Sequence, residues 1–95
     1  MNKATLATDM YADFELLGII IDKFSYHNEG FVISVHCGKC HNRCIDVFVS
    51  ESVYNKLAVQ DTVIVKGYLW NENLMGNNVL RLTANRIIKG GHLYE

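Results

Sequence analysis

Residues 43–70 read RCIDVFVSESVYNKLAVQDTVIVKGYLW, and this stretch decides the expected fold. Over residues 43–50 the apolar residues Ile45, Val47 and Val49 occupy alternate positions, which is typical of a strand with one buried face. The alternation stops over residues 51–58 and resumes over residues 62–70. The stretch therefore predicts a strand, a short helix and a second strand.

The helix is predicted from side-chain spacing and from a cap. Val53 and Leu57 lie four positions apart, so they share one face of a helix. Ser50 or Ser52 can cap it, because a serine hydroxyl accepts a hydrogen bond from an N–H group of the first helical turn. We expect the helix over Glu51–Ala58.

Three further strands are predicted outside this stretch. Residues 13–27 and 31–37 are β-branched or alternating runs separated by a turn, and residues 79–88 follow an asparagine-rich loop at 71–78. The order of three strands, one helix and two strands is the plan of the OB fold. The expected class is all-β, a five-stranded Greek-key OB-fold barrel with one short helix between strands 3 and 4. An unrelated small barrel of the SH3 type is the alternative.

The expected domain organisation is one domain, since the chain has 95 residues. Residues 1–12 are expected to form a flexible leader, residues 13–90 the OB-fold domain, and residues 91–95 a short tail.

The alternation also predicts which side chains face the core. On the fourth strand the inward set is Val63, Val65, Gly67 and Leu69. On the third strand it is Ile45, Val47 and Val49. The first strand has two apolar faces, one with Leu17, Ile19 and Ile21 and the other with Leu16, Ile20 and Phe24. A small barrel buries one face of a strand, so the helix, the leader or another protein is expected to cover the second. Homodimerisation is the simplest interpretation, and a complex with a replication enzyme is the alternative.

The composition limits the kind of ligand. The formal net charge is −1, whereas a protein that holds nucleic acid mainly by charge needs a basic surface. Binding by stacking depends less on net charge.

The sequence contains no apolar run of membrane-spanning length, and Met1–Asp9 lacks the pattern of a signal peptide. We therefore expect a cytoplasmic protein that does not bind a membrane.

Several short motifs resemble one protein family. Gln60–Leu69 reads QDTVIVKGYL, a polar turn that enters a strand ending in Val-x-Gly-x-Leu, and Thr83–Ile87 contains Ala-x-x-Ile. Leu17–Ile20 is similar to the family's opening strand, and Val53–Leu57 falls at its helix. Over about residues 13–90 the chain resembles bacterial single-stranded DNA-binding proteins and the small primosomal replication protein of the same superfamily. The resemblance implies an OB fold and single-stranded DNA as the partner.

The expected function is sequence-tolerant binding of single-stranded DNA in replication or recombination, for instance for a mobile element. Trp70 and Tyr68 are expected to stack on bases, with Phe48 assisting. The residues expected to contact phosphates are Lys66, Arg81, Lys39 and Arg43. The alternative function is a protein–protein accessory subunit of a polymerase, primase or helicase, in which the same apolar surfaces dock the enzyme.

The segment His36–Cys44 gathers side chains that bind metals. Cys37 and Cys40 have the spacing of a zinc knuckle, and His41 and Cys44 are the best candidates to complete four ligands. No second Cys-x-x-Cys pair exists, so the favoured interpretation is reduced cysteines without zinc or another cofactor. The sequence has no glycine-rich phosphate loop and no paired carboxylates in a plausible cleft. We therefore expect no catalytic residues and no enzymatic activity.

Overall fold

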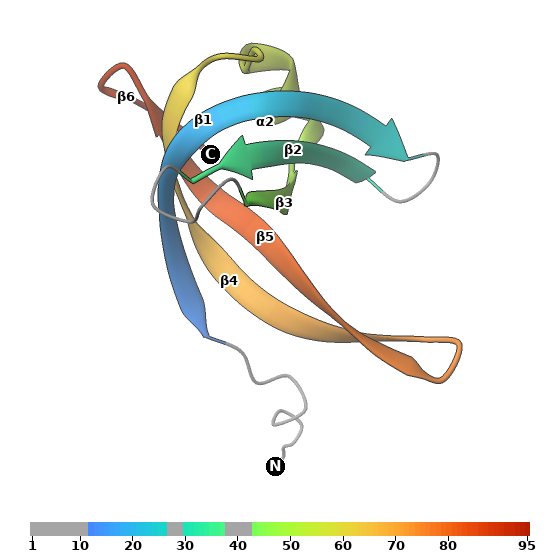
Figure 1. Ribbon diagram of the computed structural model, residues 1–95. Helices are drawn as coiled ribbons and strands as arrows, with labels where there is room; N and C mark the ends of the chain where they lie inside the picture. Colours follow the sequence, from blue (N-terminus) through green and yellow to red (C-terminus); the bar gives the residue numbers. More distant parts are fainter. Residues whose placement is uncertain (1–11, 27–29, 38–42) are drawn as a thin grey trace.

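A computed structural model describes residues 12–26, 30–37 and 43–95 of the chain (Figure 1). The elements, in chain order, are β1 (Asp13–Tyr26), β2 (Gly30–His36), β3 (Cys44–Val49), α2 (Glu51–Lys56), β4 (Thr62–Leu74), β5 (Asn77–Lys89) and β6 (His92–Tyr94). The prediction of a mostly β protein with one short helix between the third and fourth strands is confirmed.

The strands hydrogen-bond in the order β3-β2-β1-β4-β5-β6, and β3 also pairs with β5. This additional pairing closes β1 to β5 into a ring. The neighbouring strands run antiparallel except at the closure, where Phe48 of β3 pairs with Thr83 of β5 in the parallel sense. The closure brings residues from three strands to one place, because Thr83 also pairs with Tyr68 of β4.

The core lies inside the ring and consists mostly of β-branched side chains from alternate strand positions, with two further side chains from α2 and its C-terminal cap. Its buried members are Ile20, Ile33, Val35, Val47, Val49, Val53, Leu57, Val63, Val65 and Ile87. The predicted inward positions of β3 and β4 are therefore confirmed for Val47, Val49, Val63 and Val65. Ile45 and Leu69 are only partly buried.

Two irregularities in the strand register decide which side chains point outward. The pairing of β1 with β2 shifts between Ile20 and Asp22, and the pairing of β4 with β5 shifts between Lys66 and Gly67. An extra residue in a strand reverses the side on which the following residues lie. The expectation that Phe24 shares a face with Ile20 is therefore wrong. Ile20 is in the core, whereas Phe24 pairs with Val32 on the outer side of the ring.

The asparagine-rich residues 71–78 do not form the predicted loop. β4 and β5 continue through them to a two-residue turn at Met75–Gly76, where both residues have positive φ, 52° and 86°. Turns of this kind match the twist of a hairpin. The hydrogen-bonded pairing of β4 with β5 outweighs the low strand propensity of asparagine. The hairpin, which we call the arm (residues 70–81), extends away from the ring in Figure 1.

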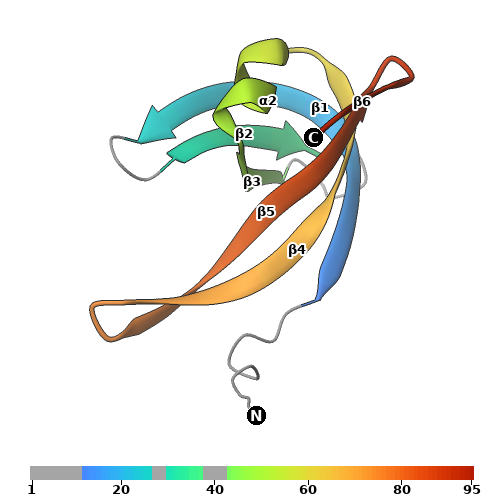
Figure 2. The same cartoon turned by 180° about the vertical axis from the view of Figure 1, so that it is seen from behind.

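The helix α2 lies across one end of the ring (Figure 2). The predicted cap is confirmed at Ser50, whose hydroxyl accepts a hydrogen bond from the Val53 N–H at 3.3 Å. Val53 and Leu57 are buried in the core, as predicted, although the helix ends at Lys56. No helix in the part of the chain that the structure describes is long and apolar enough to cross a membrane.

Two lysine ammonium groups hold the end of α2 against the sheet. Lys23 Nζ donates to the Leu57 carbonyl oxygen at 2.6 Å, and Lys89 Nζ donates to the Lys56 carbonyl oxygen at 2.9 Å. Lys89 Nζ also lies 3.1 Å from Asp61 Oδ2. The Ala58 N–H donates to the same carboxylate at 2.8 Å. The bond from Ala58 and the charge of Lys89 lower the pKa of Asp61.

This cluster predicts a pH dependence of stability. A carboxylate whose pKa is lowered on folding contributes stability above its unfolded pKa of about 3.9 and loses it as the pH falls through the folded value. We expect Asp61→Asn to lower the free energy of unfolding at pH 7 by about 1 kcal/mol, the scale of one charge-assisted hydrogen bond. Urea unfolding of both proteins should show the gap closing below pH 4. A gap that stays constant with pH contradicts the assignment, and Asp13→Asn is the exposed control.

Residues 91–95, expected as a tail, contain an additional strand. β6 pairs with β5, with Ile87 opposite Tyr94 and Lys89 opposite His92. Tyr94 is partly buried and packs against the core. The last strand therefore extends the sheet beyond the ring.

Candidate nucleic-acid interface

The outer side of the ring brings together four of the residues predicted to bind nucleic acid. Trp70 pairs with Arg81 across the hairpin, and Tyr68 pairs with Thr83. Phe48 reaches the same place from β3, since it also pairs with Thr83. Paired residues project on the same side of a sheet. We call this group, with Thr83 at its centre, the stacking face.

The Trp70 ring is held in one orientation by a hydrogen bond. Its Nε1–H donates to the Thr83 hydroxyl at 2.7 Å, and the side chain is half-buried at the base of the arm. A ring that is already fixed loses less conformational entropy when a ligand packs against it. Thr83 was not predicted as a site residue. The only signal for Thr83 in the sequence is that it lies two positions after Arg81, so the two side chains share the outward side of β5.

Arg81 lies over the Phe48 ring, with the guanidinium carbon 4.6 Å from the ring centroid. Gly30 of β2 borders the same ring, because a Cβ at this position would lie 3.4 Å from Phe48 Cδ2. The Phe48 ring is therefore partly covered by protein groups. Its position suits it to supporting the guanidinium, which itself offers a plane on which a base can stack.

The stacking face continues onto β2 and β1. Phe48 pairs with Val32, which pairs with Phe24 of β1. Val32 is 1% exposed although it is not part of the core cluster, so outer neighbours cover it. In the next row Asp46 of β3 pairs with Ser34, and Ser34 pairs with Asp22. Phe24 is a neighbour of the stacking face that the sequence reasoning missed, because the bulge in β1 has no signal in the sequence.

The other predicted phosphate contacts lie farther from Trp70. Lys66 is two positions before Tyr68 on the same strand and pairs with Glu15 and Arg86. It lines an open groove of about 450 Å³ together with those two residues. Arg43 is exposed just before the start of β3. Lys39 lies outside the described residues.

Two of the four predicted zinc ligands, Cys40 and His41, also lie outside the described residues. Cys37 is buried, and its N–H donates to the Arg43 carbonyl oxygen at 3.4 Å. Cys44 is exposed and pairs with His36. Within residues 12–26, 30–37 and 43–95, no three histidine, cysteine or acidic side chains are close enough to hold a metal ion.

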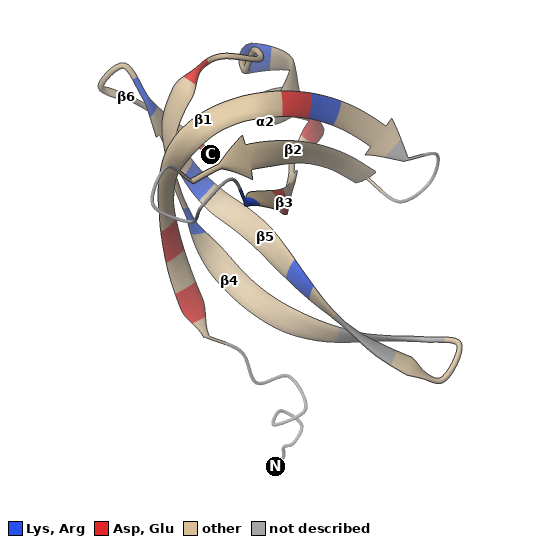
Figure 3. Ribbon diagram, in the orientation of Figure 1, with Lys and Arg blue, Asp and Glu red and all other residues tan. Residues whose placement is uncertain are grey.

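Acidic and basic residues both occur on the described strands (Figure 3). Acidic residues lie along the N-terminal half of β1, and basic residues lie on β4 and β5 (Figure 3). On the outer side of β3, Asp46 adds an exposed carboxylate on the same side of the strand as Phe48. Any nucleic acid bound here would meet few cations, so stacking must supply much of the binding.

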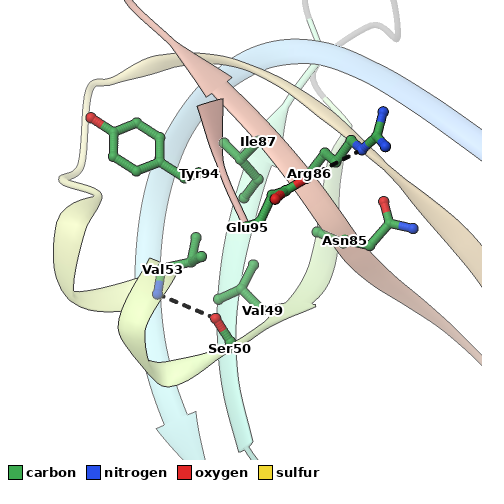
Figure 4. A pocket seen from close by; sticks show the side chains of 9 residues that line it. Val49, Ser50, Val53, Asn85, Arg86, Ile87, Tyr94 and Glu95 are labelled. Carbon is green, nitrogen blue, oxygen red and sulfur yellow. Dashed lines mark hydrogen bonds and ion pairs between the residues drawn. The ribbon is translucent and has the colours of Figure 1, made fainter. Parts of the chain in front are cut away.

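A small pocket lies between α2, β5 and β6 (Figure 4). Its volume is about 70 Å³, and Val49, Val53 and Ile87 form part of its lining. At its rim Arg86 Nε lies 3.5 Å from Glu95 Oε2, and both side chains are well exposed. The volume is well below the roughly 300–1,000 Å³ of typical small-molecule sites.

A second surface of the ring is apolar. Leu17 of β1 pairs with Ile64 of β4, Ile64 pairs with Ile88 of β5, and Ile88 pairs with Leu93 of β6. These four residues form the apolar row, which crosses four strands. Leu17 and Leu93 are 64% and 54% exposed. The expectation that the first strand has an apolar face outside the core is confirmed, because Ile19 and Ile21 are also exposed.

The bond between Trp70 and Thr83 gives a prediction for the site. Thr83→Val keeps the side-chain shape but removes the acceptor of the indole N–H. We expect the Trp70 ring to become more mobile, with lower steady-state fluorescence anisotropy and shifted emission. The free energy of unfolding should fall by about 1 kcal/mol. Thr83→Ser keeps the hydroxyl and should restore both signals. Identical spectra for the wild type and the valine variant would show that the bond does not hold the ring.

Comparisons of the chain with protein-family models, with curated proteins and with solved structures find no match.

Proposed function

We propose that the chain is an OB-fold barrel that binds single-stranded DNA without strong sequence preference and acts in DNA replication or recombination. The fold part of the proposal is supported by the strand order. A ring in which the first strand lies between the second and fourth, and the third pairs with the fifth, is the connectivity of a five-stranded Greek-key barrel. The helix between β3 and β4 fits the same plan.

The observation that carries the binding proposal is the stacking face. It combines an aromatic ring fixed by a hydrogen bond, Trp70, with a cation that lies over a second ring, Arg81 over Phe48. A single-stranded nucleic acid offers flat bases and a charged backbone in the same repeat. Base stacking on an aromatic ring contributes roughly 1–3 kcal/mol per base and tolerates any sequence.

The path of the bound strand follows from the placement of the cations. Trp70 and Arg81 lie where the arm meets the ring, and Arg43 lies five residues before Phe48 on the chain. Five residues of extended strand span roughly 16 Å. We propose that a strand of a few nucleotides stacks at Trp70 and runs across β3 toward Arg43. Tyr68 provides a further ring beside Trp70.

The expected affinity is modest and depends weakly on salt. The proposed phosphate contacts are few, and the chain carries a net charge of −1. Each neutralised phosphate of a single strand contributes about −0.7 to the slope of log K against log salt. With about four contacts, the slope should be no steeper than roughly −3.

Binding of labelled DNA tests this proposal. Fluorescence anisotropy should show saturable binding of a labelled oligo-dT strand and much weaker binding of a duplex of the same length. The preference is expected because the bases of a duplex are already stacked and cannot reach Trp70. Equal affinity for the two forms, or no binding of the single strand at micromolar protein, overturns the proposal.

A second candidate function is favoured by the apolar row. Leu17 and Leu93 expose much of their surface at its two ends, and exposed contiguous apolar surface commonly marks a protein contact. In this alternative the chain is an accessory subunit that docks a polymerase, primase or helicase, or a second copy of itself. Light scattering of the purified chain distinguishes self-association from docking of another protein, since a dimer should have twice the monomer mass of 10.8 kDa.

A further inference from the structure

A row of polar residues, Asp46, Ser34 and Asp22, lies beside the stacking face on β3, β2 and β1. Asp46 lies two residues before Phe48 on β3, so both side chains project from the same side of the strand. Phe48 is partly buried, whereas Asp46 is exposed. A base that stacks at Phe48 and Arg81 therefore has its edge near the Asp46 carboxylate, because same-face neighbours are only about 7 Å apart.

Arg81, the cation of the stacking face, forms no ion pair with Asp46. No hydrogen bond or ion pair joins its carboxylate to another side chain in the part of the chain described, and the paired position on β2 is Ser34, a neutral hydroxyl. Arg81, the nearest cation by register, lies against the Phe48 ring. A negative group in this position repels phosphates. The phosphates of a bound strand should then lie away from Asp46, with the base edges turned toward it.

Carboxylates are selective for base edges that carry N–H donors. Two carboxylate oxygens match the N1–H and N2–H₂ groups of guanine, which point in the same direction. Cytosine and adenine each offer one amino group. Thymine offers a single N3–H that lies between two carbonyl oxygens. A carboxylate repels these oxygens, because both groups are negative. Asp46 therefore discriminates among bases that stack equally well.

We propose that Asp46 is a specificity-determining residue that biases the stacking face toward guanine-containing single strands and against oligo-thymidine. The proposal rests on the proposed single-strand binding and adds a base preference to it. Ser34, which lies between Asp46 and Asp22 in the register, is 7% exposed and therefore too buried to contact the base.

Three labelled strands of about 12 nucleotides, a length within the range of OB-fold sites, test the proposal by anisotropy. One is all thymidine, one is a repeat of dT-dT-dG, and one has inosine in place of each guanine. Isolated guanines avoid four-stranded structures. Inosine lacks only the N2 amino group, so it removes one of the two hydrogen bonds to Asp46. The guanine strand should bind at least about fivefold more tightly than oligo-thymidine, with the inosine strand between them.

The variant Asp46→Asn should reduce the ratio of guanine to thymidine affinity to near 1, because one acceptor oxygen becomes a donor. Glu51→Gln on α2 is the matched control, since it removes the same charge from an exposed side chain away from the face. It should leave the ratio unchanged. Equal wild-type affinity for all three strands, or a ratio that survives in Asp46→Asn, overturns this proposal while leaving single-strand binding intact. Failure of every strand to bind overturns the proposed function itself.

Discussion

Gly67→Ala is expected to lower the free energy of unfolding by more than about 3 kcal/mol, at the upper end of what overpacking costs. A Cβ at this position would clash with the Thr83 carbonyl oxygen and lie 2.8 Å from the Ala84 Cα. Both atoms belong to the backbone of β5, so no side chain can move aside. Gly67 also borders the register shift between β4 and β5, where the strands approach closely.

Thermal unfolding measures this effect. For a domain of this size, a loss of 1 kcal/mol lowers Tm by about 4–8 °C, so we expect a fall of more than about 12 °C. Gly90→Ala is the control. Gly90 has φ of 59° and open space around it, so alanine there costs only the roughly 1–2 kcal/mol of a left-handed backbone. A Gly67 variant that melts within a few degrees of the wild type would contradict the contact between the strands.

Trp70→Ala is expected to raise the Kd for single-stranded DNA by about 5-fold to 150-fold, which corresponds to the roughly 1–3 kcal/mol of one stacked base. The indole is the largest ring of the stacking face, and Thr83 fixes its orientation. Stability should fall less than for a core residue such as Val65, because Trp70 is only half-buried and lies outside the core cluster.

Anisotropy of a labelled strand measures this change, because the variant has no tryptophan left. Trp70→Phe is the matched control. It keeps a ring for stacking and loses the hydrogen bond to Thr83, so its Kd should lie between those of the wild type and the alanine variant. An alanine variant that melts far below the wild type would mean that the ring is a core residue. An alanine variant that binds DNA as tightly as the wild type would show that Trp70 is not part of the binding site.

The sequence predicts the arrangement of the ring well where one face of a strand is buried. On β4 Val63 and Val65 occupy alternate positions and face the core, and on β3 Val47 and Val49 do the same. The alternation works because each strand must bury one face and the period of a strand is two residues. The cap at Ser50 was also predictable, since only a few residue types can satisfy the first helical turn.

The remaining features depend on contacts between distant residues. The bulge near Ile20 moves Phe24 to the outer side, and the sequence contains no mark of an inserted residue. The asparagines before Met75 have low strand propensity, but pairing between β4 and β5 outweighs it. Thr83 belongs to the site only because three strands meet there. The hydrogen bond to Trp70 therefore requires the folded arrangement.

The intrinsic fluorescence of Trp70 tests the central claim most directly, because this residue is the only tryptophan in the chain and lies in the proposed site. Unlabelled oligo-dT is titrated into the wild-type protein at low salt and again at higher salt. We predict saturable quenching whose midpoint moves to higher DNA concentration as the salt concentration rises. Emission that stays unchanged at micromolar DNA would contradict stacking on Trp70 and favour docking of another protein as the function of the chain.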